Sequence, residues 1–298
     1  MAGFGDKLEA FVRGRDIKQL IGIPLTVFVV SLLVLGVLFA TTGSPVNLGM
    51  EFKGGTMISM QTDDSVSELE ELYSSYALID VRKAGERAVM QFGPMDNDEQ
   101  RALEQSVMDT YSNVEIRQIG AVYGADLQAQ ALKALVFSFI GMAIVVFLIF
   151  RTFVPSLAVV LSALSDITIA AAFMTIVGIE LSLGTVAALL MLIGYSVDSD
   201  ILLTTRVLKR RGSIDEKISL ALHTGLTMTT TTLAALVVMY FVTTFSYLIT
   251  STASQINLLS DIAIVLIFGL LADIMNTWML NTGILKWYVA KNPRGVKK

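Results

Sequence analysis

Apolar residues gather in six runs, and each run is about as long as a bilayer is thick. The runs are 21–41, 132–150, 156–178, 181–205, 220–243 and 258–280. A transmembrane helix needs about 20 consecutive, mostly apolar residues. The pattern therefore predicts a polytopic α-helical membrane protein with six transmembrane helices. The first run is too long for a signal-peptide core, and no small-residue cleavage site follows it, so we expect it to stay as an anchor.

Residues 42–128 show a different pattern, with shorter apolar stretches separated by turn residues. Alternation predicts strands at 56–62, 78–83, 87–92 and 114–119, and helical spacing predicts helices at 65–76 and 96–111. Ser65 and Glu68 have the spacing of a capping box at the start of the first of these helices. The β-α-β-β-α-β order is that of a ferredoxin-like α+β domain. We therefore expect such a domain between transmembrane helices 1 and 2.

Lysine and arginine collect at one set of helix ends, namely in residues 1–20, at Arg151, in 206–217 and in the tail 284–298. Basic loops mark the cytoplasmic side. We therefore expect cytoplasmic N- and C-termini, with 1–20 as an interfacial helix and 42–128 outside the membrane. The expected divisions are a cytoplasmic segment 1–20, helix 1 at 21–41, the outer domain 42–128, helices 2–6 within 129–283 and a basic tail 284–298.

The amino-acid composition excludes several kinds of functional site. The 298 residues are 54% hydrophobic and 16% charged, with no cysteine and one histidine. Disulfides, thiolate metal sites and multi-histidine metal sites are therefore excluded. A formal net charge of −4 is not the footprint of a nucleic-acid-binding protein. We expect no cofactor, no metal and no nucleic-acid partner.

Ionisable residues inside the apolar runs are the strongest functional signal, because a carboxylate in hydrocarbon costs roughly 2.5–3.5 kcal/mol on insertion scales. Asp198 and Asp200 point to nearly opposite sides of one helix, and Asp273 lies at about the same depth, about 10 Å from the cytoplasmic end. One interpretation is an ion relay, with His223 able to titrate near neutral pH. The alternative is that these residues are buried polar groups bonded across helices. The ion-coupling candidates are Asp198, Asp200, His223, Asp273, Asp166 and Arg206.

Two further residue types affect packing. The threonines of the fifth run (Thr224, Thr227, Thr229, Thr230, Thr231 and Thr232) are expected to bond to the preceding helical turn or to line a polar path. The glycines within or beside the spans are expected to permit close helix approach. These are Gly141, Gly178, Gly184 and Gly194.

A resemblance to a known family rests on three stretches. Gly49-Met-Glu-Phe-Lys-Gly-Gly55 is similar to the Gly-x-Asp-Phe-x-Gly-Gly signature of the SecD/SecF family of protein-export membrane proteins, which is related to RND transporters. Ile193-Gly-Tyr-Ser-Val197 and the threonine-rich fifth run resemble the SecF branch of that family. Bacterial members have Asn-Asp where this chain has Asp198-Ser199, and an arginine at the position of His223. These differences suggest an archaeal type.

The resemblance covers nearly the whole chain and implies a function. It implies a non-enzymatic subunit of the cell (cytoplasmic) membrane that pairs with SecD beside a SecYEG-type translocon. By this resemblance the unit promotes translocation of unfolded secretory polypeptides, in bacteria by drawing on the proton gradient, and coupling to an ion gradient is an expectation for this chain. On this view a titrating carboxylate near Asp198 shifts helices 4–6, and the motion reaches the outer domain through Gly49, Glu51, Phe52, Gly54 and Gly55. Gly54-Gly55 is then a hinge, a tight backbone approach or a plain turn.

Three alternatives remain at the level of the sequence. An RND-type exporter of small molecules or lipids has larger outer domains than the one expected here. An intramembrane aspartyl protease could use Asp198 and Asp273, but Leu271-Ala-Asp273 lacks the Gly-x-Gly-Asp motif of such enzymes. A non-catalytic assembly subunit would only stabilise its partner.

Overall fold

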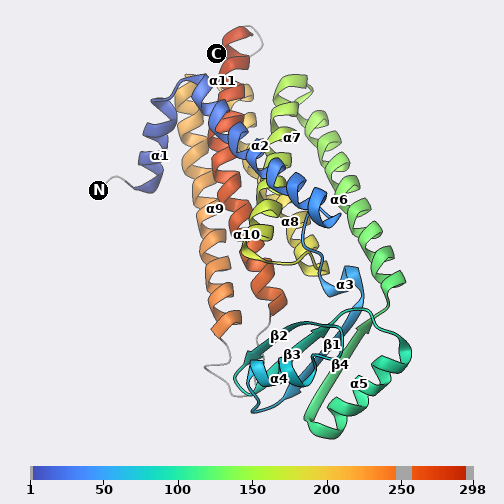
Figure 1. Ribbon diagram of the computed structural model, residues 1–298. Helices are drawn as coiled ribbons and strands as arrows, with labels where there is room; N and C mark the ends of the chain where they lie inside the picture. The colour runs from blue at the N-terminus through green and yellow to red at the C-terminus, as the bar shows by residue number, and fades with distance from the viewer. Residues whose placement is uncertain (1–2, 246–256, 293–298) are drawn as a thin grey trace.

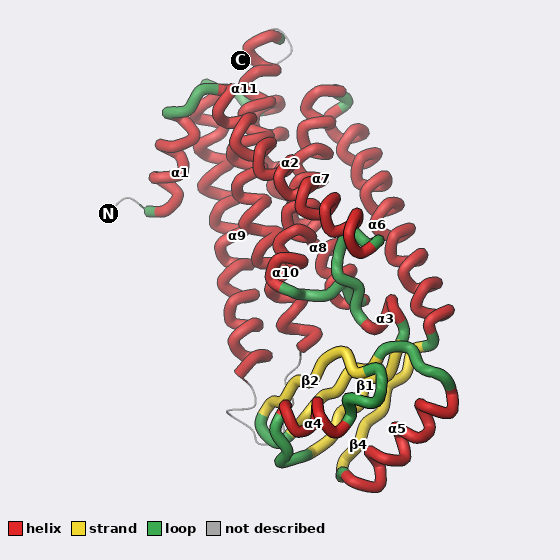
Figure 2. The backbone as a smooth tube through the Cα atoms, viewed as in Figure 1, coloured by secondary structure: helices red, strands yellow, loops and turns green. Residues whose placement is uncertain are grey.

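The computed structural model describes residues 3–245 and 257–292. The basic residues Arg294, Lys297 and Lys298 of the predicted tail lie outside the described residues. A long helical bundle forms one part of the molecule, and a small sheet with its own helices lies at one end of the bundle (Figures 1 and 2).

Six helices of the described chain are long and apolar enough to cross a membrane. They are α2 (Ile17–Thr42), α6 (Ala121–Phe150), α7 (Phe153–Val177), α8 (Leu183–Lys209), α9 (Ile214–Phe245) and a last span over Leu258–Lys291. Gly43 and Gly178 end α2 and α7 in the left-handed conformation, which glycine adopts without strain. The six predicted spans are confirmed, and α7 and α8 are the most buried of them.

The last span is not a uniform α-helix, which the sequence analysis did not predict. It consists of α10 (Asn257–Met275), a π-helical segment η2 (Asn276–Asn281) and α11 (Thr282–Lys291). The Thr282 hydroxyl donates to the Thr277 carbonyl oxygen, 3.1 Å away, across the widened turn. Such single-turn π insertions are rare and occur frequently at functional sites.

The outer part holds β1 (Gly55–Gln61), α4 (Val66–Leu72), β2 (Leu78–Ala84), β3 (Arg87–Phe92), α5 (Asn97–Thr110) and β4 (Ser112–Ile119). The four strands are antiparallel in the order β2-β3-β1-β4. Ser65 caps α4, and Glu68 returns a hydrogen bond to the Ser65 backbone, as the capping-box spacing predicts. The helix ends at Leu72, however, four residues before the predicted end.

A short helix α3 (Met50–Lys53) joins α2 to β1, and an N-terminal helix α1 (Phe4–Arg13) precedes α2. Val12 of α1 is buried against Leu222 and Leu226 of α9, in the same apolar cluster as Leu285. Helices α1 and α11 lie at the end of the bundle away from the sheet (Figure 1). The described basic connections, after α6 and after α8, lie at that same end.

Candidate functional site

Three aspartates from three helices meet in the interior of the bundle. Asp166 lies on α7, Asp200 on α8 and Asp273 on α10. Their exposed fractions are 0%, 0% and 1%. The cluster formed by these three residues with Ser196, Asn276, Thr277 and Asn281 is named the acid cluster below. Buried charged groups are rare unless they are paired, so the acid cluster is the first candidate for a functional site.

Asp166 is surrounded by hydrogen-bond donors. The Ser196 hydroxyl donates to its Oδ2 over 2.6 Å, and the Asn276 amide donates to its Oδ1 over 2.6 Å. The Asn276 amide also reaches Ser165 Oγ at 2.9 Å. Each carboxylate oxygen of Asp166 therefore has one donor.

Asp200 and Asp273 are joined through one hydroxyl. Thr277 Oγ1 lies 2.9 Å from Asp200 Oδ1 and 3.0 Å from Asp273 Oδ1. A hydroxyl carries one hydrogen, so it donates to only one of two carboxylates. The other contact is a full hydrogen bond only when that acid holds a proton and donates it to Thr277 Oγ1. This geometry therefore suits a pair of acids that carries one proton.

Apolar clusters lie on both sides of the acid cluster. Along α8, Asp200 lies between Leu192 and Leu203, which belong to two different apolar clusters. Along the last span, Leu270 and Leu285 bracket Asp273 and η2 in the same way. Apolar surroundings strengthen electrostatic interactions and make an uncompensated charge costly.

Asp198 lies apart from the acid cluster. It is exposed on the opposite side of α8, and no described residue is within hydrogen-bond distance of its carboxylate. The expectation that Asp198 and Asp200 face opposite sides is met, but the buried member of the pair is Asp200. The functional role predicted for Asp198 stays a prediction.

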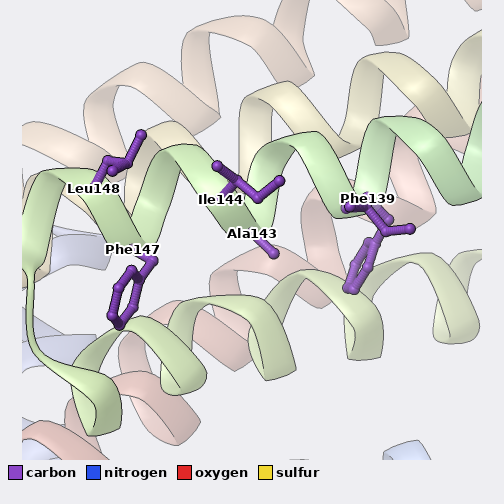
Figure 3. A pocket seen from close by; sticks show the side chains of 6 residues that line it. Phe139, Ala143, Ile144, Phe147 and Leu148 are labelled. Atoms are coloured by element: carbon purple, nitrogen blue, oxygen red, sulfur yellow. The ribbon is translucent and has the colours of Figure 1, made fainter.

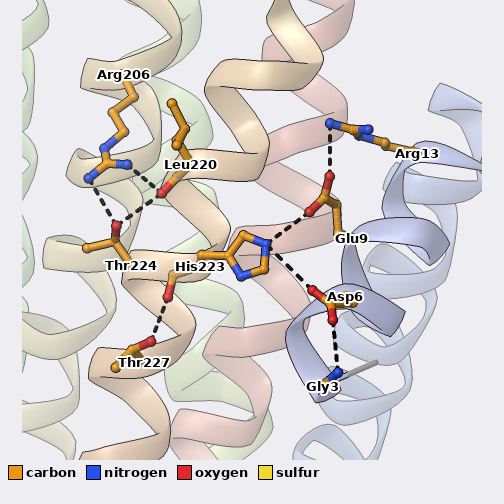
Figure 4. A network of polar contacts seen from close by, with 9 residues as sticks. All are labelled: Gly3, Asp6, Glu9, Arg13, Arg206, Leu220, His223, Thr224 and Thr227. Carbon is orange, nitrogen blue, oxygen red and sulfur yellow. Dashed lines mark hydrogen bonds and ion pairs between the residues drawn. The ribbon is translucent and has the colours of Figure 1, made fainter. Parts of the chain in front are cut away.

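His223 and Arg206 do not contact the acid cluster, and Figure 4 shows the polar contacts that they make with other residues. His223 Nε2 is 3.0 Å from Glu9 Oε2 and 4.0 Å from Asp6 Oδ1, so the histidine contacts α1. Hydrogen bonds from Ser219 and then His223, helped by the Arg13 charge, hold the pKa of Glu9 below its usual range. Arg206 donates to the Leu220 carbonyl oxygen and to Thr224 Oγ1, and so joins the end of α8 to α9.

The motif after the first span is built around close backbone contacts. Gly54 and Gly55 have φ values of +79° and +137°. A Cβ atom on Gly54 would lie 2.7 Å from Ala121 Cα, and one on Gly55 would lie 2.2 Å from the Phe92 carbonyl oxygen. The sequence predicted a hinge, a tight backbone approach or a plain turn for this pair, and the structure shows the tight backbone approach.

The same motif contacts the start of α8. The Leu183 amide donates to Glu51 Oε2 over 2.6 Å, and the Gly49 amide donates to the Leu181 carbonyl oxygen over 2.8 Å. Phe52 is buried against Ala131 of α6 and Val186 of α8. The outer sheet is therefore attached, through β1 and α3, to the helix that carries Asp200.

Sequence reasoning missed the neutral members of the acid cluster. Ser196, Asn276, Thr277 and Asn281 are polar residues within apolar spans, and this was the available signal. The six threonines of α9 do bond to the preceding turn, as expected. Within the described residues, the close approach expected of the glycines is seen at one of the four positions. Gly184 packs against Leu258, whereas a Cβ on Gly141, Gly178 or Gly194 would meet nothing within 4 Å.

A shallow hollow on α6 does not belong to this site. It is lined by apolar side chains of α6 alone, namely Phe139, Ile140, Ala143, Ile144, Phe147 and Leu148 (Figure 3). No titratable group lines it. Its apolar lining offers nothing to an ion.

Comparisons with known proteins agree on one family. The model for "Protein export membrane protein SecD/SecF, C-terminal" matches residues 99–291, and the "SecD/SecF GG Motif" model matches residues 39–66. The protein-export membrane protein SecF of Methanolacinia petrolearia is 49% identical over 274 residues, which is 92% of this chain and 94% of that protein. SecF of Haloferax volcanii is 47% identical over 277 residues, or 91% and 92%. Both organisms are archaea.

A solved structure shares the fold. The crystal structure of SecDF, a translocon-associated membrane protein from Thermus thermophilus, superposes with a TM-score of 0.69 at 18% identity. The superposition covers 91% of this chain and 38% of that chain.

Proposed function

The chain belongs to the SecD/SecF family of protein-export membrane proteins, as a SecF subunit of the Sec export machinery, and from this premise we propose that its acid cluster couples an ion gradient to export. The observation that carries the proposal is the burial of three carboxylates that accept hydrogen bonds from two hydroxyls and two amides, with Asp200 and Asp273 sharing the Thr277 hydroxyl. Proton uptake or release at such a site changes which hydrogen bonds are satisfied, and therefore which packing of α7, α8 and the last span is preferred.

The proposed motion reaches the outer domain along α8. Asp200 and Leu183 are seventeen residues apart on one helix, about 25 Å at 1.5 Å per residue. At the Leu183 end, the helix amide is held by Glu51 Oε2. A shift or rotation of α8 at Asp200 is therefore delivered to the motif Gly49–Gly55 and, through Gly55, to β1. Contiguous rigid elements of this kind carry coupling between distant sites.

We place the outer α+β domain, within 42–128, outside the membrane. Its element order and strand order support a ferredoxin-like domain. The basic segments lie at the opposite end of the bundle, and the positive-inside rule makes that end cytoplasmic. The proposed organisation keeps 1–20 and 284–298 on the cytoplasmic side, with 21–41 and 129–283 in the cell membrane. The proposed substrates are unfolded secretory polypeptides, handed over by a SecYEG-type translocon.

Replacing Asp200 by asparagine tests the coupling role. Asparagine keeps the shape of the side chain but neither ionises nor takes up a proton. A coupling free energy of about 1–3 kcal/mol corresponds to about 5- to 150-fold, so gradient-stimulated export should fall at least about fivefold. Export of a secreted reporter is measured in cells that carry the variant as their sole SecF, with SecD recovery from mild detergent measured in parallel.

The control for this experiment is Asp261→Asn, a half-buried acid of α10 that lies outside the acid cluster. It should export like the wild type. If Asp200→Asn also exports normally while the gradient is intact, the acid cluster is structural and the chain is better described as an assembly subunit.

Pairing with SecD is the second part of the proposal, and an exposed face of α8 supports it. Met191 and Tyr195 are 43% and 45% exposed, and they share this face with Ala187, Gly194 and Asp198. A carboxylate that faces lipid is costly, and small residues let a neighbouring helix approach closely. We assign this face to a SecD helix that brings a cation or a hydrogen-bond donor to Asp198.

Substitution of Gly194 by leucine tests that face. A Cβ there meets nothing within 4 Å, so the isolated chain should fold normally. A SecD helix packed on Gly194 should instead be displaced, and recovery of SecD with the variant should fall about tenfold, the equivalent of about 1.4 kcal/mol. Gly36→Leu on α2 is the matched control, since Gly36 is equally open. Equal SecD recovery with both variants would place the partner on another face.

A further inference from the structure

Helix α1 carries its acidic and its basic side chains on different faces. Glu9 and Asp6 are turned to α9, where their carboxylates lie 3.0 Å and 4.0 Å from His223 Nε2 (Figure 4). Arg13 bridges to Glu9 over 2.9 Å and offsets its charge. Val12, on the same side of the helix, is 1% exposed in the apolar cluster that it shares with α9. The acids and the apolar residues on this side of α1 are therefore engaged within the molecule.

The opposite face of α1 is exposed and basic. Lys7 and Phe11 are exposed and lie one helical turn apart, so they share a side of the helix. The Arg15 guanidinium lies 4.8 Å from the centre of the Phe11 ring, which places it on that side as well. Among the described residues, no carboxylate lies within ion-pair distance of Lys7 or Arg15. Lys7, Phe11 and Arg15 are named the outer face of α1 below.

The Arg15 guanidinium is held in place and still has free donors. It lies over the Phe11 ring, and its Nη1 donates to Gln19 Oε1 over 3.3 Å. A guanidinium has five N–H donors in a planar fork, which suits the oxygens of a phosphate group. The Lys7 ammonium supplies three more donors. The charge and the geometry of the outer face therefore fit an anionic partner that carries phosphate.

The position of α1 along α9 selects a lipid as that partner. Gly5 lies against Leu226, and Val12 shares an apolar cluster with Ile218, so α1 runs beside this stretch of α9. The stretch begins four residues and ends twelve residues after Ile214, the first residue of α9, which is about 6–18 Å along the helix. Helix α1 therefore lies where a membrane helix passes through the headgroup layer, at the end of the bundle away from the sheet (Figure 1).

We propose that the outer face of α1 binds the phosphate groups of anionic phospholipids in the cytoplasmic leaflet, with the Phe11 ring at the boundary of the acyl chains. The inference uses the orientation proposed above and does not depend on the coupling role of the acid cluster. Anionic lipids give this leaflet a negative surface potential, which attracts lysine and arginine beside a membrane helix. Aromatic side chains of interfacial helices lie at the same boundary. Because α1 is also fixed to α9, lipid bound there holds the first turns of α9 at the membrane surface.

The test is energy transfer from α1 to labelled lipids. The chain has no cysteine, so Ala10→Cys, at an exposed position of α1, takes a single donor fluorophore. The labelled full chain is placed in phosphatidylcholine nanodiscs with acceptor-labelled phosphatidylglycerol or acceptor-labelled phosphatidylcholine. The acceptor fraction that gives half-maximal transfer should be at least about fivefold lower for phosphatidylglycerol, the effect of one lysine or arginine near an anionic surface. Added NaCl should reduce this difference by screening.

Variants in the same labelled background assign the preference to the outer face. Lys7→Gln combined with Arg15→Gln should remove it, and the variant should fold because the face packed on α9 is unchanged. Lys133→Gln combined with Arg101→Gln, two exposed cations of α6 and α5, should keep it.

Three results would overturn the lipid site. Equal transfer to both lipids in the chain with the native outer face would leave that face to a protein partner. A preference that persists in the Lys7 and Arg15 double variant would place the lipid on another basic segment. Loss of the preference on adding inorganic phosphate, at an ionic strength matched with NaCl, would assign the face to a soluble anion.

Discussion

Alanine at Gly55 is expected to disrupt the junction between the outer sheet and the membrane helices. The added Cβ would lie 2.2 Å from the Phe92 carbonyl oxygen, a backbone atom of the neighbouring strand β3, and the φ value of +137° is unfavourable for any residue with a Cβ. Backbone strain of this kind costs about 1–3 kcal/mol, and the clash adds to it. We expect a loss of at least about 3 kcal/mol in the stability of the outer domain.

Limited trypsin digestion of the solubilised full chain measures this loss through cleavage at Arg87 and Arg117, which lie in β3 and β4. The matched control is Gly120→Ala. Gly120 is at the same junction, but its φ is −67° and a Cβ would meet nothing within 4 Å. Its digestion should match that of the wild type. If Gly55→Ala is digested as slowly as the control, the close approach of β1 to Phe92 does not constrain the outer domain.

Replacing Asn276 by leucine should destabilise the membrane bundle more than any other single change in the acid cluster. Leucine removes the amide that donates to Asp166 and reaches Ser165. A buried acceptor that loses its hydrogen-bond donor costs about 1–3 kcal/mol, and more where it is charged. Thermal unfolding in detergent should show a much lower Tm than the wild type.

A double variant checks the cause of that loss. Asp166→Leu combined with Asn276→Leu removes both the acid and its donor, and replaces them with apolar groups that suit the surroundings. The pair should recover much of the stability lost in the single Asn276→Leu variant, because the two effects are coupled. Simple additivity of the two single changes would mean that Asp166 is neutral or that it finds another donor.

Local rules predicted much of the fold because they act over a few residues. Ser65 and Glu68 satisfy each other within one helical turn, so their spacing alone locates the start of α4. The hairpin between β2 and β3 turns at Gly85, which has a φ of +63°. The six spans follow from the length of each apolar run, which the bilayer thickness sets directly.

The site was harder to predict because it depends on which face of each helix is turned inward. Spacing showed that Asp198 and Asp200 face opposite sides, but α8 is apolar on both sides, so nothing in the sequence indicates which aspartate is buried. The position of Asp273 along its span predicts that it lies at the same depth in the membrane as Asp198 and Asp200. It does not predict which residues of other helices lie beside it. The contact of His223 with Glu9 joins residues 214 positions apart, and no local pattern encodes it.

The π-helical segment has a consequence for the comparison of relatives. A π turn is the geometry of an α-helix that holds one additional residue, and each residue of an α-helix contributes about 100° of rotation. A relative that lacks one residue between Asp273 and Asn281 would keep its span and its acids. Its α11 would be turned by about 100°, however, and the position equivalent to Asn281 would face away from Asp200. A single-residue gap at this point in an alignment would therefore separate relatives that hold the second amide from those that do not, although their aspartates are the same.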